Sequence, residues 1–78
     1  MKRIETIKHE FSLIGNDGTL YEVHITGDLK IEAGFIDTVL VYGRNMEDDL
    51  INLNTDFCST NQIEKQYNNG ASIRIIRR

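Results

Sequence analysis

Apolar and polar side chains alternate with a period of two in the first third of the chain, over residues 7–13 and again over residues 21–26. This period is typical of a β-strand that buries one face, so two strands are predicted there. Between them lies Asn16-Asp17-Gly18, which has the composition of a tight turn. The two strands are therefore predicted to form a β-hairpin.

The turn fixes the register of the predicted hairpin. A three-residue hairpin loop needs a left-handed residue at its third position, where glycine carries no steric penalty, and Gly18 stands there. A slip by one position would turn the apolar side chains to the opposite face. The predicted pairs are Gly15 with Thr19, Leu13 with Tyr21, Phe11 with Val23, and His9 with Ile25.

Three later segments are also predicted to be strands. Phe35–Tyr42 is the strongest, and its apolar residues on both faces indicate a central strand. Leu29–Ala33 alternates weakly, which predicts a short edge strand or a widened loop. Ala71–Arg78 is predicted to close the chain as a strand with Ile73 and Ile75 facing inward.

Residues 46–57 are predicted to form a helix. Asn45 precedes a run of acidic residues, as an N-cap does where the helix dipole favours negative charge. Ile51, Leu53 and Thr55 also alternate, so a strand over residues 49–55 stays open as the alternative. The residues that recur at helical spacing, and would form one stripe facing the sheet, are Met46, Leu50, Leu53 and Phe57.

A second, shorter helix is predicted to end at Tyr67. Ser59 or Thr60 supplies a capping hydroxyl at its start. Ile63 and Tyr67 lie one helical turn apart, and Asn69-Gly70 is typical of a helix C-terminus.

Together these elements predict a single small α+β domain over residues 1–78. Its order is strand, strand, weak strand, strand, helix region, strand. The expected architecture is an antiparallel or mixed sheet of roughly four to five strands, with one or two short helices at about residues 46–68 packed on one face.

The size of the chain limits where a function can reside. It has 78 residues, of which 40% are hydrophobic and 27% charged. A chain this short buries only ~60% of its unfolded surface, which leaves little room for an enclosed active site. We therefore expect the functional surface to be an outer face or a sheet edge.

The single cysteine, Cys58, predicts neither an internal disulfide nor a cysteine-based metal site. The first residues are basic but hold no continuous apolar stretch, so no secretory signal peptide is expected. No stretch is long enough to span a membrane. These features predict a cytoplasmic protein without a membrane attachment.

His9, His24 and Cys58 are the candidates for catalysis or metal binding. In the predicted register His9 lies with the apolar set, whereas His24 points outward opposite Glu10, so the two imidazoles do not share a face. A cross-strand pair with Glu10 accounts for His24, a partly buried position for His9, and a structural thiol for Cys58. We expect no catalytic residue, no metal and no cofactor.

Two charged clusters are candidates for binding a partner. The first is the acidic run Glu47, Asp48 and Asp49 at the predicted helix start, which lacks the ligand spacing of a calcium loop. The second cluster is basic and would form one patch only if the first and last strands were neighbours. The alternative explanation is that these charges protect a sheet edge from pairing with another chain. The basic residues are Lys2, Arg3, Lys8, Arg74, Arg77 and Arg78.

These patterns favour a non-enzymatic protein-binding module, such as an adaptor, a subunit or an inhibitor, that binds through Glu47, Asp48 and Asp49. A net charge of −3 would steer it towards a basic partner, including a nucleic-acid-handling protein. The alternative is a nucleic-acid-binding domain that uses the terminal basic residues. A homodimer through edge pairing of Leu29–Ala33 is compatible with both functions.

Overall fold

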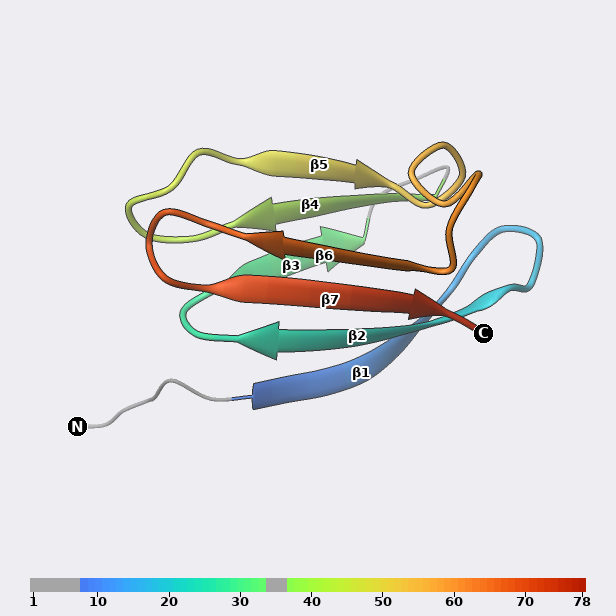
Figure 1. Cartoon of the computed structure of the whole chain (residues 1–78), viewed down its shortest axis with the longest axis horizontal. Helices are drawn as coiled ribbons and strands as arrows, with labels where there is room; N and C mark the ends of the chain where they lie inside the picture. Colours follow the sequence, from blue (N-terminus) through green and yellow to red (C-terminus); the bar gives the residue numbers. More distant parts are fainter. Residues whose placement is uncertain (1–7, 34–36) are drawn as a thin grey trace.

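The computed structural model describes residues 8–33 and 37–78, and these form seven strands in two antiparallel sheets (Figure 1). The four-stranded sheet has the order β1-β2-β7-β6, and the three-stranded sheet the order β3-β4-β5. The strands are β1 (Lys8–Ile14), β2 (Leu20–Thr26), β3 (Lys30–Ala33), β4 (Thr38–Tyr42), β5 (Asp49–Asn52), β6 (Gln62–Gln66) and β7 (Ser72–Arg77).

The predicted hairpin is confirmed in its turn and its register. Phe11 pairs with Val23, Leu13 with Tyr21 and His9 with Ile25 along β1 and β2. Gly18 has a φ of 88°, in the left-handed region that the turn requires. The Gly15 N–H donates to the Thr19 carbonyl oxygen at 2.8 Å and closes the loop.

The other predicted strands are also confirmed where the structure describes them. β4 is central in its sheet, between β3 and β5, and β3 is an edge strand. β7 buries Ile73 and Ile75 and leaves Arg74 exposed, as its alternation predicts. The first two residues of the predicted strand Phe35–Tyr42, and the glycine before it, lie outside the described residues.

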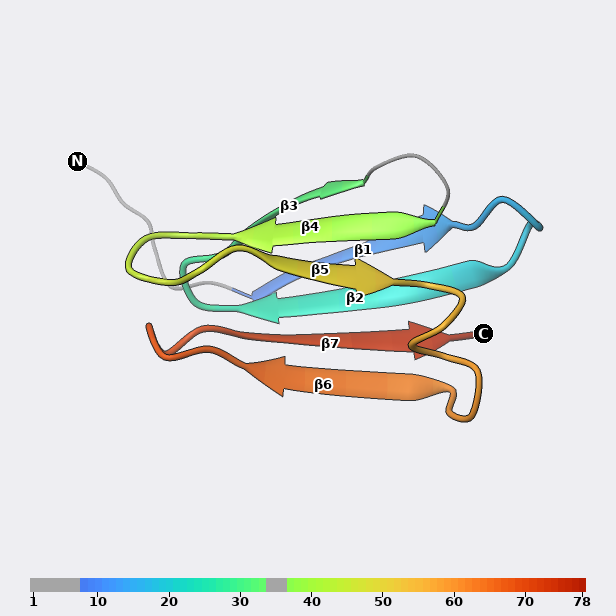
Figure 2. The same ribbon diagram turned by 90° about the horizontal axis from the view of Figure 1, so that it is seen from above.

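Alternate residues of both sheets form the hydrophobic core. Figure 2 shows the strands of the two sheets from above. The inner positions of a β-sandwich alternate with outward-facing polar ones. Within the part of the chain that the structure describes, no polar or charged side chain is buried. The buried residues are Tyr21, Val23, Ile25, Leu29, Val39, Val41, Ile51, Leu53, Phe57, Ala71, Ile73 and Ile75.

The predicted α+β fold is wrong, because the described part of the chain contains no helix. Asn45 does not cap a helix: its φ of 62° places it in a left-handed turn between β4 and β5. Leu50 is 61% exposed, whereas Leu53 and Phe57 are buried, so the expected apolar stripe does not exist. The alternation of Ile51 and Leu53 was the correct signal, and residues 49–52 form β5.

The second predicted helix is also wrong, since residues 62–66 form β6. The Thr60 hydroxyl accepts a hydrogen bond from the Gln62 N–H at 3.2 Å, which shapes a turn rather than a helix start. Ile63, Lys65 and Tyr67 are partly buried and alternate with exposed residues. A strand with one inward face explains this pattern.

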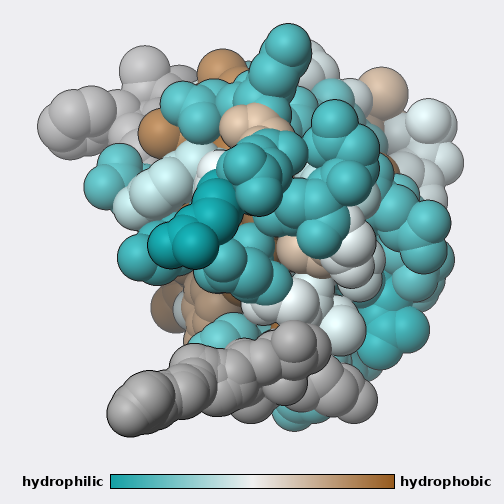
Figure 3. All heavy atoms as spheres, turned by 90° about the vertical axis from the view of Figure 1, so that its left-hand side faces the viewer, coloured by the Kyte–Doolittle hydropathy of each residue, from teal (hydrophilic) through white to brown (hydrophobic). Residues whose placement is uncertain are grey.

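Three connections meet at one end of the sandwich, which presents a largely hydrophilic surface (Figure 3). They join β2 to β3, β4 to β5, and β6 to β7. The Asn69 side-chain amide donates to the Asp28 carbonyl oxygen at 3.3 Å and to the Arg44 carbonyl oxygen at 3.0 Å. A single asparagine of the last connection therefore links the two others.

Candidate functional site

The outer face of the β3-β4-β5 sheet carries apolar side chains in the open. Val39, Val41 and Ile51 point into the core, so the intervening residues Leu40 and Leu50 face outward. Leu40 pairs with Leu50, whose side chain is 61% exposed. This face therefore presents an aliphatic pair that joins the central strand β4 to the edge strand β5.

The connection between β4 and β5 carries two acidic residues, Glu47 and Asp48, that lie shortly before Leu50 in the sequence. Glu47 and Asp48 are both exposed, and Asp48 immediately precedes β5. Glu32 of β3 lies across from Leu40 in the same row of the sheet. Leu40, Leu50, Glu32, Glu47 and Asp48 are called the acidic sheet face from here on.

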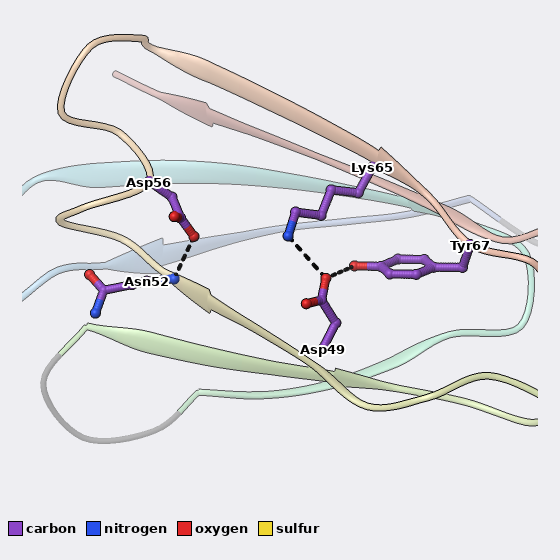
Figure 4. A network of polar contacts seen from close by, with 5 residues as sticks. All are labelled: Asp49, Asn52, Asp56, Lys65 and Tyr67. Atoms are coloured by element: carbon purple, nitrogen blue, oxygen red, sulfur yellow. Dashed lines mark hydrogen bonds and ion pairs between the residues drawn. The ribbon is translucent and has the colours of Figure 1, made fainter.

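Asp49 does not belong to the acidic sheet face, although the sequence grouped it with Glu47 and Asp48. Its Oδ2 accepts a hydrogen bond from the Lys65 ammonium at 3.0 Å and another from the Tyr67 hydroxyl at 2.9 Å (Figure 4). Asp49 lies on β5 and Lys65 on β6, so these contacts join the edges of the two sheets. Asp49 is a structural residue that closes one side of the sandwich.

The electrostatics of this contact follow from its partial burial. Burial raises the pKa of Asp49, but the hydrogen bonds from Lys65 and Tyr67 outweigh it and hold the pKa below its usual value of 3.8. Burial and the neighbouring Asp49 carboxylate raise the pKa of Tyr67 well above its usual value of 10.0. The carboxylate and the neutral phenol are therefore the forms that stabilise the fold.

Replacing Asp49 with asparagine is expected to cost about 1–2 kcal/mol of unfolding free energy at neutral pH, because a partly exposed charged acceptor is lost. The lowered pKa of Asp49 gives stability that is present above 3.8 and lost as the pH falls through the lower folded pKa. The raised pKa of Tyr67 gives stability that is present below 10.0 and lost at higher pH. The unfolding free energy of Asp49→Asn should therefore vary less with pH than that of wild type in both ranges. Urea unfolding at about pH 3, 7 and 11 measures this.

The matched control for this variant is Asp48→Asn. It removes the same charge from the neighbouring residue, whose side chain is exposed. Its unfolding free energy should change by less than about 0.5 kcal/mol at each pH. Equal losses in the two variants would contradict a structural role specific to Asp49.

His24 lies on the outer face of the four-stranded sheet between two carboxylates. Its Nδ1 is 3.5 Å from the Glu10 Oε2, and its Nε2 is 3.6 Å from the Glu22 Oε1. Glu22 also accepts a contact from the Arg78 guanidinium at 2.8 Å, and this hydrogen bond lowers the pKa of Glu22. The predicted pair of His24 with Glu10 is confirmed, and Glu22 is a second partner that the sequence analysis missed.

This cluster borders an open depression of about 210 Å³, lined by residues of β1 and β2. That volume is below the range of ~300–1,000 Å³ typical of small-molecule sites. Among the described residues no group of three or more His, Cys, Asp or Glu side chains is arranged to hold a metal ion. Each ring nitrogen of His24 lies within 3.6 Å of a carboxylate oxygen.

The two other candidates for chemistry are both exposed. His9 lies on β1 opposite Ile25 and is exposed rather than partly buried. Cys58 is a free, exposed thiol in the connection that follows β5.

The predicted basic patch requires the first and last strands to be neighbours, and the described strands do not meet this condition. β2 lies between β1 and β7, so the first and last described strands are not neighbours. Arg78 contacts Glu22, whereas Arg77 bonds the Asn61 side chain at 2.8 Å and stands over the Phe57 ring. Arg74 lies in register between His24 and Glu64. Lys2 and Arg3 lie outside the described residues, and Lys8 begins β1.

The exposed position of Leu50 is a feature of the surface that the sequence analysis missed. A helical spacing assigned Leu50 to the core, whereas strand alternation with Ile51 places it outside.

The described residues contain no helix long and apolar enough to cross a membrane. Comparison with protein-family models, with curated proteins and with solved structures finds no match to this chain.

Proposed function

We propose that this chain is a non-enzymatic protein-binding module that acts by occupying the surface of a partner protein through its acidic sheet face. The observation that carries the proposal is the exposed Leu50, whose side chain is 61% exposed on the outer face of the edge strand β5, beside Leu40 of the central strand β4. A cytoplasmic location is part of the proposal, because the chain has a single, exposed thiol.

The shape of the acidic sheet face favours a protein over a small molecule. It is built on the three strands β3, β4 and β5, and its exposed Leu50 stands out from the face rather than lining a hollow of the four-stranded sheet, where the depression of about 210 Å³ lies. Small ligands need concave sites that enclose most of their surface. A protein partner can instead cover an open face and bury Leu50, which would contribute about 1–2 kcal/mol of apolar burial.

The charges around Leu50 favour a basic partner. Glu47 and Asp48 are exposed, so their carboxylates are available to lysine or arginine side chains. Such rim charges mainly accelerate association and select the partner, whereas a buried apolar anchor supplies affinity. The expected partner surface has an apolar pocket bordered by cations, as on a nucleic-acid-handling protein.

Affinity capture with paired variants tests this function. Tagged wild-type chain should capture a defined protein from nuclease-treated lysate, and Leu50→Ser and Asp48→Lys should each reduce its recovery by about tenfold or more. The captured protein is then purified and titrated, and its affinity should fall as salt rises.

Matched controls come from the other sheet. Leu20→Ser removes a leucine that is 40% exposed on β2, and Glu64→Lys reverses an exposed charge on β6. Both should capture the partner as wild type does. Undiminished capture by Leu50→Ser, or recovery that disappears with nuclease, would reject the acidic sheet face as the binding surface.

A further inference from the structure

We propose that two copies of this chain pair through the free edges of their β1 strands, which joins the two four-stranded sheets into one continuous antiparallel sheet. The occupant of the edge is a second copy of the same chain. Among residues 8–33 and 37–78, no strand pairs with the side of β1 that faces away from β2, here called the β1 edge. The inference does not depend on the acidic sheet face.

The hydrogen-bond pattern of the hairpin shows which backbone groups point to the β1 edge. The Gly15 N–H donates to the Thr19 carbonyl oxygen at 2.8 Å, so this is a hydrogen-bonded position. Such positions alternate along an antiparallel ladder, which directs the backbone groups of Phe11 towards β2. The backbone groups of Glu10 and Ser12 consequently point to the β1 edge.

An independent hydrogen bond supports this assignment. The Arg78 N–H donates to the Leu20 carbonyl oxygen at 2.8 Å, so Leu20 uses that carbonyl for the β7 side. Leu20 is the partner of Ile14 in the hairpin register. Ile14 therefore occupies a non-hydrogen-bonded position, and its own backbone groups point to the β1 edge as well.

The other sheet edges are shorter or already engaged. β3 and β5 have four residues each, against seven in β1. The Asn52 N–H at the end of β5 donates to the Asp56 carboxylate at 2.9 Å (Figure 4). The Asp56 N–H donates back to the Asn52 carbonyl oxygen at 3.0 Å. β6 has five residues, and its Lys65 side chain reaches across to Asp49 of β5. The β1 edge is therefore the longest one left open, which favours pairing with another chain.

The side chains of β1 also leave apolar surface for a partner to cover. The four-stranded sheet is wider than the three-stranded sheet opposite, and Phe11 on its inner side is 37% exposed. Ile14 on its outer side is 73% exposed. Pairing with a second copy would place new neighbours beside both side chains.

One register satisfies both the backbone and the charges. With the two-fold axis at Phe11, all seven residues of β1 pair with a residue of the second copy. Each residue whose backbone N–H and carbonyl point to the β1 edge then lies opposite another such residue, so the hydrogen bonds can form. A register centred on Glu10 would oppose two carboxylates, which is destabilising, and it would shorten the ladder. The pairs across the proposed interface are Lys8 with Ile14, His9 with Leu13, Glu10 with Ser12, and Phe11 with Phe11.

This symmetry has a consequence for binding, which rests on the proposed function. A two-fold axis perpendicular to the joined sheet places both three-stranded sheets on the same side of it. Two acidic sheet faces would then point in one direction. The dimer would bind a repeated or dimeric partner with higher avidity than one copy does.

Sedimentation equilibrium over a range of protein concentrations tests the dimer. Wild type should approach twice the mass of one chain, with a dissociation constant on the order of micromolar, as expected for a small interface. Ser12→Pro removes an edge-facing N–H that the hairpin does not use, and should weaken the dimer by about ten- to hundredfold. Ser12→Ala loses the hydroxyl but keeps the N–H, and should dimerise as wild type does.

A charge pair at the same position tests the register without altering the backbone. Ser12→Lys faces Glu10 of the second copy and should tighten the dimer, whereas Ser12→Glu should loosen it, with roughly two- to thirtyfold between each variant and wild type. Circular dichroism confirms that each variant is folded. A monomeric mass at all concentrations, or a dimer that Ser12→Pro and both charge variants leave unchanged, would overturn the proposal.

Discussion

Replacing Phe57 with alanine is expected to remove most of the stability of the fold. Phe57 is fully buried, and its ring packs edge-to-face on Tyr21 with centroids 5.2 Å apart. The Arg77 guanidinium covers the ring at 5.9 Å from its centroid. Truncation of a buried phenylalanine costs about 3–5 kcal/mol, because it leaves a cavity and removes apolar burial. A chain of this length has only about 5 kcal/mol to lose.

Urea unfolding followed by far-UV circular dichroism measures this loss. Phe57→Ala should show a strongly lowered midpoint, with much of the chain unfolded even without urea. Phe57→Leu keeps most of the apolar volume and should recover more than half of the loss. Leu50→Ala, on a side chain that is 61% exposed, should stay within about 0.5 kcal/mol of wild type. A loss in Phe57→Ala as small as that of Leu50→Ala would contradict the central position of this ring.

The position of Phe57 explains why the fold class was mistaken. Leu53 and Phe57 are both buried and lie four residues apart, a spacing that fits a helix. Four is also a multiple of two, so the same spacing fits a strand or a turn that leaves a strand. Ile63 and Tyr67 present the same ambiguity. Other offsets decide between the two periods. Leu50 lies three residues before Leu53, a helical offset, yet its side chain is exposed, whereas Lys65 lies two residues from both Ile63 and Tyr67, a strand offset, and is partly buried.

Local chemistry fixed the hairpin but not the second half of the chain. Asn16-Asp17-Gly18 determines a turn by its own backbone requirements, and the alternation on both sides agrees with it. β6 instead carries Lys65 on its inner side, which looks like a break in the apolar pattern. Its ammonium is tolerated there because Asp49 of another strand accepts it at 3.0 Å. A partner 16 residues away in the sequence cannot be read from local periodicity.

The candidate binding surface was predictable only in part, for the same reason. Glu47 and Asp48 are exposed, as expected of an acidic run in a connection. Asp49 is indistinguishable from them by composition, but strand alternation turns it inward to Lys65 and Tyr67. The separation of the first and last described strands depends on strand order, which places β2 between β1 and β7. Strand order follows from the packing of two sheets and not from either terminus.

Replacing Gly27 with alanine is expected to destabilise the fold by about 2–5 kcal/mol, because two effects add. Gly27 has a φ of 95°, where an L-residue is strained. A Cβ on Gly27 would also lie 2.9 Å from the Ala71 Cα, where the β2–β3 connection meets the start of β7. Backbone atoms cannot move aside as a flexible side chain can, so the two connections must separate. The unfolding free energy of Gly27→Ala in urea measures the sum of both effects.

Gly18 and Gly70 separate backbone strain from this steric contact. Their φ values are 88° and 91°, and a Cβ on either would meet no atom within 4 Å. Gly18→Ala and Gly70→Ala should therefore show only the strain, about 1–2 kcal/mol each. The excess in Gly27→Ala reports how tightly the connections at this end are held, where Asn69 also links Asp28 and Arg44. Equal losses at all three glycines would show that this end of the sandwich yields at no cost, and that its connections move independently of one another.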